Sequence, residues 1–168
     1  MPDITLRPVT RDDLRPLFRL KVNPEQAGFV APNEITLAQA PYETGAEVFG
    51  LWQGETLVGM IATIDMARHA YRMEGDDAES LYIWRLMVGA EHQGKGYGRA
   101  ALAAMHERAN GGGFRRLSLS VVPTNSVAIA LYESVGFQNS GRIIDGEMLL
   151  LKDLEPADSK QQGGQNSI

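Results

Sequence analysis

Residues 93–98 read QGKGYG, and Arg99 follows them. Glycines let successive backbone amides point into one concavity, and a helix N-terminus adds positive potential, so a glycine loop that opens a helix suits a pyrophosphate. Lys95 and Arg99 would add mobile positive charge beside it. The alternative is a glycine-rich turn with solvated basic side chains, and the hexapeptide alone does not separate the two.

The spacing of these glycines excludes two nucleotide-binding motifs. A dinucleotide-binding loop reads G-x-G-x-x-G, and counting from Gly94 puts Arg99 where the third glycine belongs. A nucleoside-triphosphate loop has Ser or Thr after its lysine, whereas Gly96 follows Lys95. The loop therefore indicates neither of these ligands.

A second group of residues with chemical potential lies further along the chain. Asn125 precedes a segment that Gly136 ends, and one helical face of this segment carries Ala128, Leu131 and Tyr132. Asn125 can cap this helix or contact a ligand. Tyr132 can be a core tyrosine with a satisfied hydroxyl or a phenol that takes part in chemistry.

The composition bounds the classes of protein that remain. The chain of 168 residues is 43% hydrophobic and 22% charged, with a net charge of −5, as in a globular domain without a nucleic-acid partner. It has no cysteine, which excludes disulfides, thiolate metal sites and a cysteine nucleophile, and its three scattered histidines predict no metal site. Neither an apolar run of the ~20 residues that span a membrane nor a signal-peptide pattern is present, so we expect a cytoplasmic protein without a membrane partner.

The elements that must position these residues alternate along the chain. Strand patterns cover residues 4–9, 46–53, 56–65, 81–88, 116–122 and 147–152, and another strand starts at residue 137. Helix patterns cover residues 10–21, 36–42, 99–109 and 125–136, with Thr10, Thr36 and Asn125 as candidate N-caps. Residues 22–35 and 67–80 read as loops. This order predicts one α/β sandwich domain with a mixed sheet over residues 1–154, and the polar residues 155–168 predict a disordered tail.

Taken together, the two motifs resemble those of the GCN5-related N-acetyltransferase (GNAT) superfamily. The resemblance rests on Gln93-x-x-Gly96-x-Gly98 combined with Asn125…Leu131-Tyr132…Gly136-Phe137, and it extends from about Ile4 to Leu154. The segments PEQAGFVAPNE and LSLSVVPTNSVAIALYESVGFQNSGR look most like the bacterial spermine/spermidine (polyamine) acetyltransferases.

The resemblance implies a fold and a site for acetyl-CoA. In the family, a mixed, mostly antiparallel sheet with helices on both faces splays into a V-shaped cleft between two central parallel strands, here residues 81–88 and 116–122. By resemblance, backbone of the first strand pairs with the pantetheine arm, the glycine loop holds the pyrophosphate, and Tyr132 is the general acid that protonates the leaving thiolate. The cofactor-binding residues that it implies are Leu86, Met87, Val88, Gln93, Gly94, Lys95, Gly96, Tyr97, Gly98, Arg99, Asn125 and Tyr132.

The acceptor side of this cleft is less clearly marked. The lack of cysteine favours direct attack by an amine in a ternary complex. Glu25 and Glu34 are candidate bases, although a solvated loop carboxylate is the simpler interpretation of each. Arg85 stands where some members of the family have an acid, which argues against a strand carboxylate as base and against a polyamine. Candidate acceptor-binding residues are Phe29, Asn33, Trp84 and Asp145.

The sequence therefore predicts an acetyl-CoA-dependent N-acetyltransferase that acts on a primary amine of a small molecule, with polyamines as one candidate class. Two alternatives stay open. One is a peptide or protein N-acetyltransferase acting on an N-terminus or a lysine, and the other is a non-catalytic acyl-CoA-binding sensor, against which Tyr132 counts. Relatives in the superfamily often dimerise, so the resemblance also allows a homodimer.

Overall fold

The computed structural model describes residues 1–155, and residues 156–168 of the predicted tail lie outside the described residues. One seven-stranded sheet with the order β1-β2-β3-β4-β5-β7-β6 forms its centre. Strands β4 and β5 run parallel, and the other neighbouring strands pair antiparallel. The strands are β1 (Thr5–Pro8), β2 (Ala46–Gln53), β3 (Thr56–Asp65), β4 (Ser80–Val88), β5 (Arg116–Val121), β6 (Gln138–Ile144) and β7 (Glu147–Asp153).

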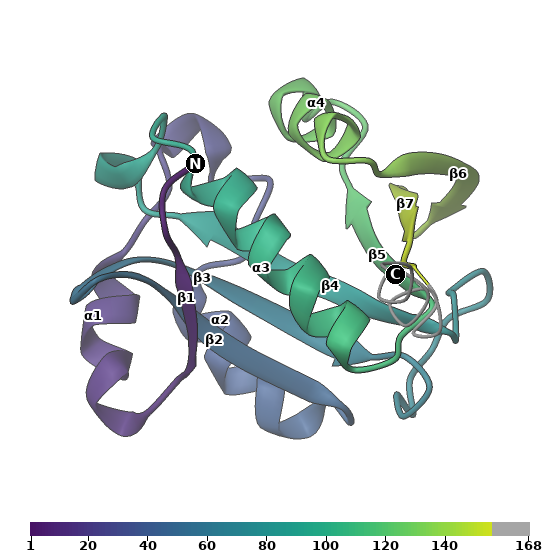
Figure 1. Ribbon diagram of the computed structural model, residues 1–168, viewed down its shortest axis with the longest axis horizontal. Coiled ribbons are helices and arrows are strands. Elements are labelled where there is room, and N and C mark those ends of the chain that lie inside the picture. Colours follow the sequence, from purple (N-terminus) through teal and green to yellow (C-terminus); the bar gives the residue numbers. More distant parts are fainter. Residues whose placement is uncertain (156–168) are drawn as a thin grey trace, which may run out of the picture.

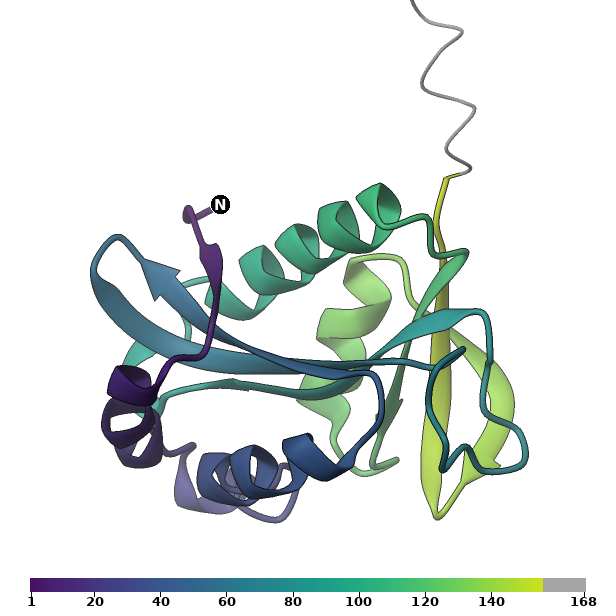
Figure 2. The same cartoon turned by 90° about the horizontal axis from the view of Figure 1, so that it is seen from below.

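Helices cover both faces of this sheet. The α-helices are α1 (Leu14–Arg19), α2 (Asn33–Gln39), α3 (Tyr97–Gly111) and α4 (Ser126–Ser134), and one-turn 3-10 helices occupy Arg11–Asp13, Pro24–Gln26, Ala40–Tyr42 and Ala90–His92. Helices α1 and α2 lie on one side of the sheet and α3 on the other (Figure 2). Within residues 1–155, no helix combines the length and the apolar character that crossing a membrane requires.

Two apolar clusters hold the helices to the sheet. The larger cluster joins α3 to the sheet through buried residues such as Leu102, Met105 and Ile83, and apolar side chains of α4 pack against it. The smaller cluster lies under α1 and contains Leu17, Leu20, Met60 and Met87. Because β3 contributes to both clusters, its sequence reads as an almost continuous apolar run.

The two parallel strands separate halfway along their length. Residues 80–83 of β4 pair with residues 116–119 of β5, while β4 continues to Val88 with no partner on that edge in the described part of the chain. Figure 1 shows β5 turning away from β4 toward α4. The structure therefore confirms the predicted mixed, mostly antiparallel sheet with helices on both faces and a splayed cleft between its parallel strands.

A bulge in β4 lies at the point of separation. Ala62 of β3 pairs with Arg85 and Thr63 pairs with Ile83, so Trp84 has no partner on β3. A bulge inserts one extra residue and changes which face the following side chains occupy. As a result, Ile83 packs in the cluster of α3, whereas Met87 packs in the cluster of α1.

The structure corrects the predicted bounds of the first two helices. The second helix begins at Asn33, not after a cap at Thr36, because the carbonyl of Pro32 accepts from the amides of Ile35 and Thr36. The first helical segment divides into a 3-10 turn and α1, and it ends at Arg19 because Leu20 adopts an extended backbone.

Candidate active site

The fork between β4 and β5 contains a cavity of about 510 Å³. One wall is the second half of β4, and the opposite wall is the end of β5 with the inner face of α4. The glycine loop closes one end, the segment from Val22 to Ala31 covers one side, and Glu147 reaches in from β7. The cleft therefore collects residues from six separate parts of the chain.

The glycine loop has the backbone shape of an anion site. Gly94 and Gly96 have φ values of +73° and +84°, a region that residues with a Cβ rarely adopt. Gly96 is also the N-cap of α3, and no side chain among residues 1–155 caps the start of this 15-residue helix. Because the first amides of a helix have no intrahelical acceptor, this end of α3 offers free donors and the positive end of its dipole.

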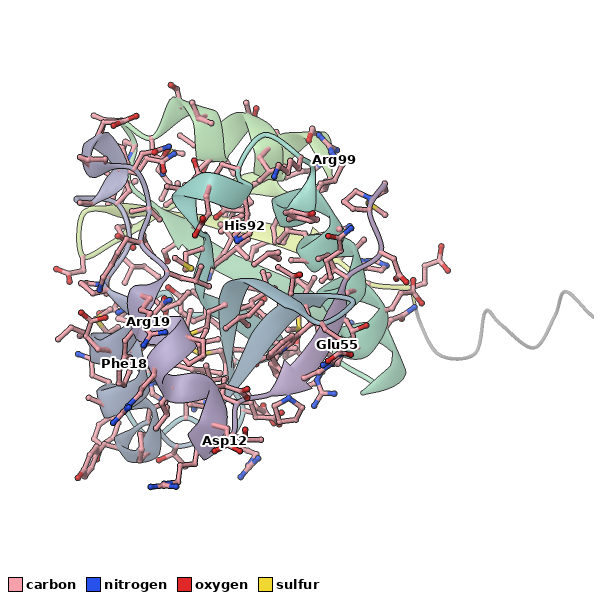
Figure 3. All side chains as sticks on the ribbon, turned by 90° about the vertical axis from the view of Figure 1, so that its left-hand side faces the viewer. Asp12, Phe18, Arg19, Glu55, His92 and Arg99 are labelled. Atoms are coloured by element: carbon pink, nitrogen blue, oxygen red, sulfur yellow. The ribbon has the colours of Figure 1, made fainter. Side chains whose placement is uncertain are left out.

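A hydrogen bond and a close approach of the two helices connect the start of α3 to α4. The Nη2 atom of Arg99 donates a hydrogen bond to Ser134 Oγ over 2.8 Å. A Cβ on Gly98 would lie 3.4 Å from Leu131 Cδ2, so the glycine permits the two helices to approach closely. Figure 3 shows Arg99 at this end of the molecule, well separated from Arg19 on α1.

The side chain of Gln93 forms hydrogen bonds with other residues of the protein. Its Nε2 donates to Val88 O at 3.0 Å and to Gln26 Oε1 at 2.8 Å, and its Oε1 accepts from Asn23 Nδ2 at 3.0 Å. These bonds join the end of β4, the glycine loop and the turn at residues 23–26. Gln93 therefore orients the loop through its side chain.

Two other side chains of the loop form contacts with neighbouring parts of the protein. The Tyr97 ring is buried, and its hydroxyl donates to Gln53 Oε1 at 2.8 Å on the β2–β3 hairpin. Lys95 is exposed, its Nζ lies 3.4 Å from Glu91 O, and it does not line the cavity. The loop therefore lines the cleft at Tyr97 but not at Lys95.

Helix α4 carries the predicted pair Asn125 and Tyr132 into the cleft. Asn125 caps α4, since its Oδ1 accepts from the amide of Ala128 at 3.3 Å, and it also lines the cavity. The Tyr132 ring packs edge-on against Phe137, with 6.0 Å between the ring centroids. Burial, together with the neighbouring Tyr82, raises the pKa of Tyr132 to about 12. The phenol consequently holds its proton at neutral pH.

The acceptor side of the cleft contains polar residues that the sequence did not single out as ligands. Tyr82 and Arg85 come from β4 and Glu147 from β7, and all three line the cavity. Burial is the main cause that raises the pKa of Tyr82, and the nearby carboxylate of Glu147 raises it further. Burial also lowers the pKa of Arg85, an effect that Tyr82, Glu147 and Glu43 oppose. These residues therefore form one electrostatically coupled group.

The shape of the cleft fits a long molecule with an anionic end. The edge of β4 that faces β5 has no partner strand in residues 84–88, so it can bind an extended polar arm. The uncapped start of α3 lies beyond the end of this edge and can bind a pyrophosphate. These are the two features that the pantetheine arm and the pyrophosphate of CoA require.

Most, but not all, of the predicted site residues meet in this cleft. Lining residues from the prediction are Phe29, Trp84, Leu86, Met87, Val88, Gln93, Gly94, Gly96, Tyr97, Gly98, Arg99, Asn125 and Tyr132. Lys95, Glu25, Glu34, Asn33 and Asp145 do not line it. The sequence named Arg85 only as a departure from the family pattern and missed Glu147. The bulge that orients Arg85 and the strand pairing that brings in Glu147 are long-range features without a local motif.

The structure gives a physical reason for two of the residues outside the cleft. Glu34 accepts hydrogen bonds from Lys21 Nζ at 2.9 and 3.0 Å, and this ion pair at the surface lowers the pKa of its carboxyl. Asn33, the first residue of α2, is buried against α1, where its Nδ2 donates to Leu17 O at 2.9 Å. Glu25 and Asp145 are exposed, in the turn Pro24–Gln26 and the β6–β7 turn.

Known proteins share this sequence pattern and this fold. The model of the acetyltransferase (GNAT) family matches residues 11–137. Spermine/spermidine N(1)-acetyltransferase of Bacillus subtilis (strain 168) is 28% identical over 156 residues, which cover 90% of this chain and 99% of the relative. Mycothiol acetyltransferase of Corynebacterium efficiens is 32% identical over 138 residues, which cover 77% of this chain and 43% of that protein. The crystal structure of PaiA N-acetyltransferase from Thermoplasma acidophilum in complex with coenzyme A superposes with a TM-score of 0.65 at 18% identity, covering 90% of this chain and 99% of that one.

Proposed function

This chain belongs to the acetyltransferase (GNAT) family, and we propose that it transfers the acetyl group of acetyl-CoA to the primary amine of a small molecule. One observation carries the proposal. The free edge of β4, the uncapped start of α3 and the phenol of Tyr132 face a single cavity. A site for the cosubstrate and a proton donor are thus present together.

The residues that would hold the cosubstrate follow from the geometry of the cleft. Backbone groups of Leu86, Met87 and Val88 would pair with the pantetheine arm. The amides of residues 94 and 96–99 would bind the pyrophosphate, with Arg99 adjacent to them. The side-chain amide nitrogen of Asn125, which the cap does not use, would contact the pantetheine arm.

Acetyl-CoA supplies the acetyl group as a thioester. The neutral amine nitrogen bonds to the carbonyl carbon, the bond from that carbon to sulfur breaks, and the nitrogen loses one proton to solvent to give the neutral amide. Tyr132 donates its proton to the departing sulfur, whose thiol has a pKa of about 8.5 in water, while the phenol is the weaker acid. The phenol is therefore protonated before the transfer and regains its proton from solvent afterwards. A positioned acid of this kind accelerates the reaction by about 10² to 10⁴.

The incoming ammonium group must lose a proton before it attacks. Glu25 and Glu34 lie outside the cavity, and Glu34 is paired with Lys21, so we assign the binding of the amine to Glu147. Glu147 lines the cavity and forms no ion pair with the described residues. Its carboxylate is therefore free to accept a hydrogen bond from an ammonium group and then to take up its proton.

Polyamines are a candidate class of acceptor because the Bacillus subtilis relative bears the name of a spermine/spermidine acetyltransferase. Phe29 and Trp84 line the cavity and can pack on the aliphatic parts of an amine. The mechanism needs residues of one chain only. We propose a cytoplasmic location, where acetyl-CoA and small amines are both present.

The test follows release of free thiol from acetyl-CoA in the presence of polyamines, aminoglycosides, amino acids and peptides. We expect turnover with at least one small primary amine. Turnover with peptides alone would favour a peptide or protein N-acetyltransferase. Tight binding of CoA without turnover of any amine would favour an acyl-CoA sensor.

A further inference from the structure

Arg85 is a cation on the acceptor side of the cleft that forms no ion pair. None of the ion pairs among residues 1–155 includes it, although Arg7, Arg108, Arg115 and Arg116 each pair with a carboxylate. Its Nε is buried without a hydrogen-bond partner. A charge that is shielded from water is costly unless a partner of opposite charge satisfies it, so the position favours an anionic ligand.

The fold fixes the orientation of this guanidinium group. Nη1 donates to the carbonyl oxygen of Trp84 at 2.9 Å, and the guanidinium carbon lies 4.7 Å from the centre of the Trp84 ring. Trp84 is the bulged residue of β4, so the bulge supplies both contacts. The Nη2 group forms no hydrogen bond within residues 1–155. A guanidinium that is held in one plane with a free donor is preorganised for a carboxylate.

The surroundings of Arg85 define the charge of the ligand. Glu147 lies on β7 in the same cavity, and Glu43, which follows the 3-10 helix Ala40–Tyr42, is a second carboxylate that favours the charged form of Arg85. Glu43 lies 3.8 Å from His69 Nε2, whereas Glu147 has no ion-pair partner within residues 1–155. On its acceptor side, the cleft thus offers one cation and one carboxylate that form no ion pair within residues 1–155. The two carboxylates near Arg85 would repel a phosphate dianion more than a carboxylate.

We propose that the acceptor carries a carboxylate as well as the amine, as an amino acid does, and that Arg85 binds this carboxylate while Glu147 binds the amine. The inference rests on the proposed acetyl transfer and names its substrate class. A polyamine would place a second ammonium group beside Arg85, where like charges repel. An amine with a carboxylate instead satisfies both unpaired groups.

Matched pairs of acceptors isolate the carboxylate. The pairs are L-lysine with cadaverine, L-ornithine with putrescine, and L-phenylalanine with phenethylamine, in which the members differ only by the α-carboxylate. We expect kcat/KM of the amino acid to exceed that of its partner by about tenfold or more in at least one pair, since a charged hydrogen bond contributes on the order of 1.5–3 kcal/mol. Binding of each compound to the protein saturated with CoA is measured in parallel by calorimetry.

Variants of Arg85 assign the preference to this side chain. In R85Q we expect KM for the amino acid to rise about tenfold or more, with a smaller change in kcat, so that the preference disappears. R85K keeps the charge and should keep a weaker preference. R19Q changes an exposed arginine on α1 (Figure 3) that is in no ion pair with the described residues, and it should behave as the wild type. The melting temperature and the affinity for CoA show that each variant is folded.

The outcomes separate the specificity from the activity. Turnover of amines with no preference for a carboxylate, with a preference for the diamines, or with a preference that R85Q retains, would overturn the inference and leave the acetyl transfer intact. Binding of amino acids that depends on Arg85, without turnover of any amine, would support the ligand assignment and contradict the proposed reaction. Absence of both turnover and binding would contradict both.

Discussion

The side-chain amide of Gln93 donates a hydrogen bond to the carbonyl oxygen of Val88 over 3.0 Å. This bond joins the first residue of the glycine loop to the last residue of β4. The two parts of the cleft that would hold the pyrophosphate and the pantetheine arm are therefore held in a fixed relation. Asn23 and Gln26 extend the connection to the segment that covers the cleft.

Replacement of Gln93 by alanine should lower both the stability of the protein and its affinity for CoA. The variant loses three hydrogen bonds of a half-buried side chain, and we expect a loss of roughly 1–3 kcal/mol in the free energy of unfolding. We also expect about a tenfold rise in the Kd for CoA, measured by titration. The control Q39A changes an exposed glutamine at the end of α2. An unchanged affinity in Q93A would contradict the role of the bond.

The two glycines at the ends of α3 should respond in opposite directions to alanine. Gly96 has φ +84°, and a Cβ there would lie 3.3 Å from the Pro2 ring, so G96A should cost about 1 kcal/mol and weaken CoA binding. Gly111 is helical and has open space around it, so G111A should be neutral or stabilise by up to about 1 kcal/mol. Chemical denaturation measures both changes. Equal effects of the two variants would show that the loop conformation is unimportant.

Two substitutions of Asn125 separate its cap from its proposed contact with CoA. N125A removes both functions, and we expect a loss of about 1 kcal/mol in stability together with weaker CoA binding. N125S retains an oxygen that caps α4 but lacks the amide nitrogen. It should therefore unfold at nearly the wild-type denaturant concentration and still bind CoA weakly. If N125S binds CoA as the wild type does, Asn125 is only a cap.

The buried phenol of Tyr132 predicts a stability change at alkaline pH. Burial raises the pKa of this phenol from its ordinary value of 10.0 to about 12, so the folded state retains a proton that the unfolded state loses. Between these two values stability falls as pH rises, and below about pH 10 Tyr132 contributes no pH dependence. Unfolding of the wild type should therefore depend on pH more steeply in this range than unfolding of Y132F. If the free energy of unfolding has the same pH dependence in the two proteins, the phenol of Tyr132 does not have a raised pKa.

The sequence predicts the part of the cleft that local motifs encode. The glycine spacing predicts the loop, and the structure extends α3 by starting it at Tyr97, inside that loop. The position of Asn125 before an amphipathic segment predicts the cap of α4 correctly. In both cases the residues that determine the structure are close together in the chain.

The acceptor side depends on contacts between distant segments, which the sequence alone does not reveal. The bulge at Trp84 is a one-residue shift in the pairing of β3 with β4, and it determines where Arg85 points. Glu147 reaches the cleft because β7 pairs with β5. Glu34 resembles a free carboxylate in the sequence but pairs with Lys21, which lies 13 residues earlier.

The turnover number of Y132F tests the central claim most directly. With an acceptor that the wild type acetylates, we expect kcat to fall by about 10² or more while the Kd for CoA stays the same, because the phenol donates a proton only as sulfur departs. Y71F, in an exposed loop, is the matched control and should retain wild-type turnover. A kcat of Y132F equal to that of the wild type, with CoA binding intact, would contradict the account.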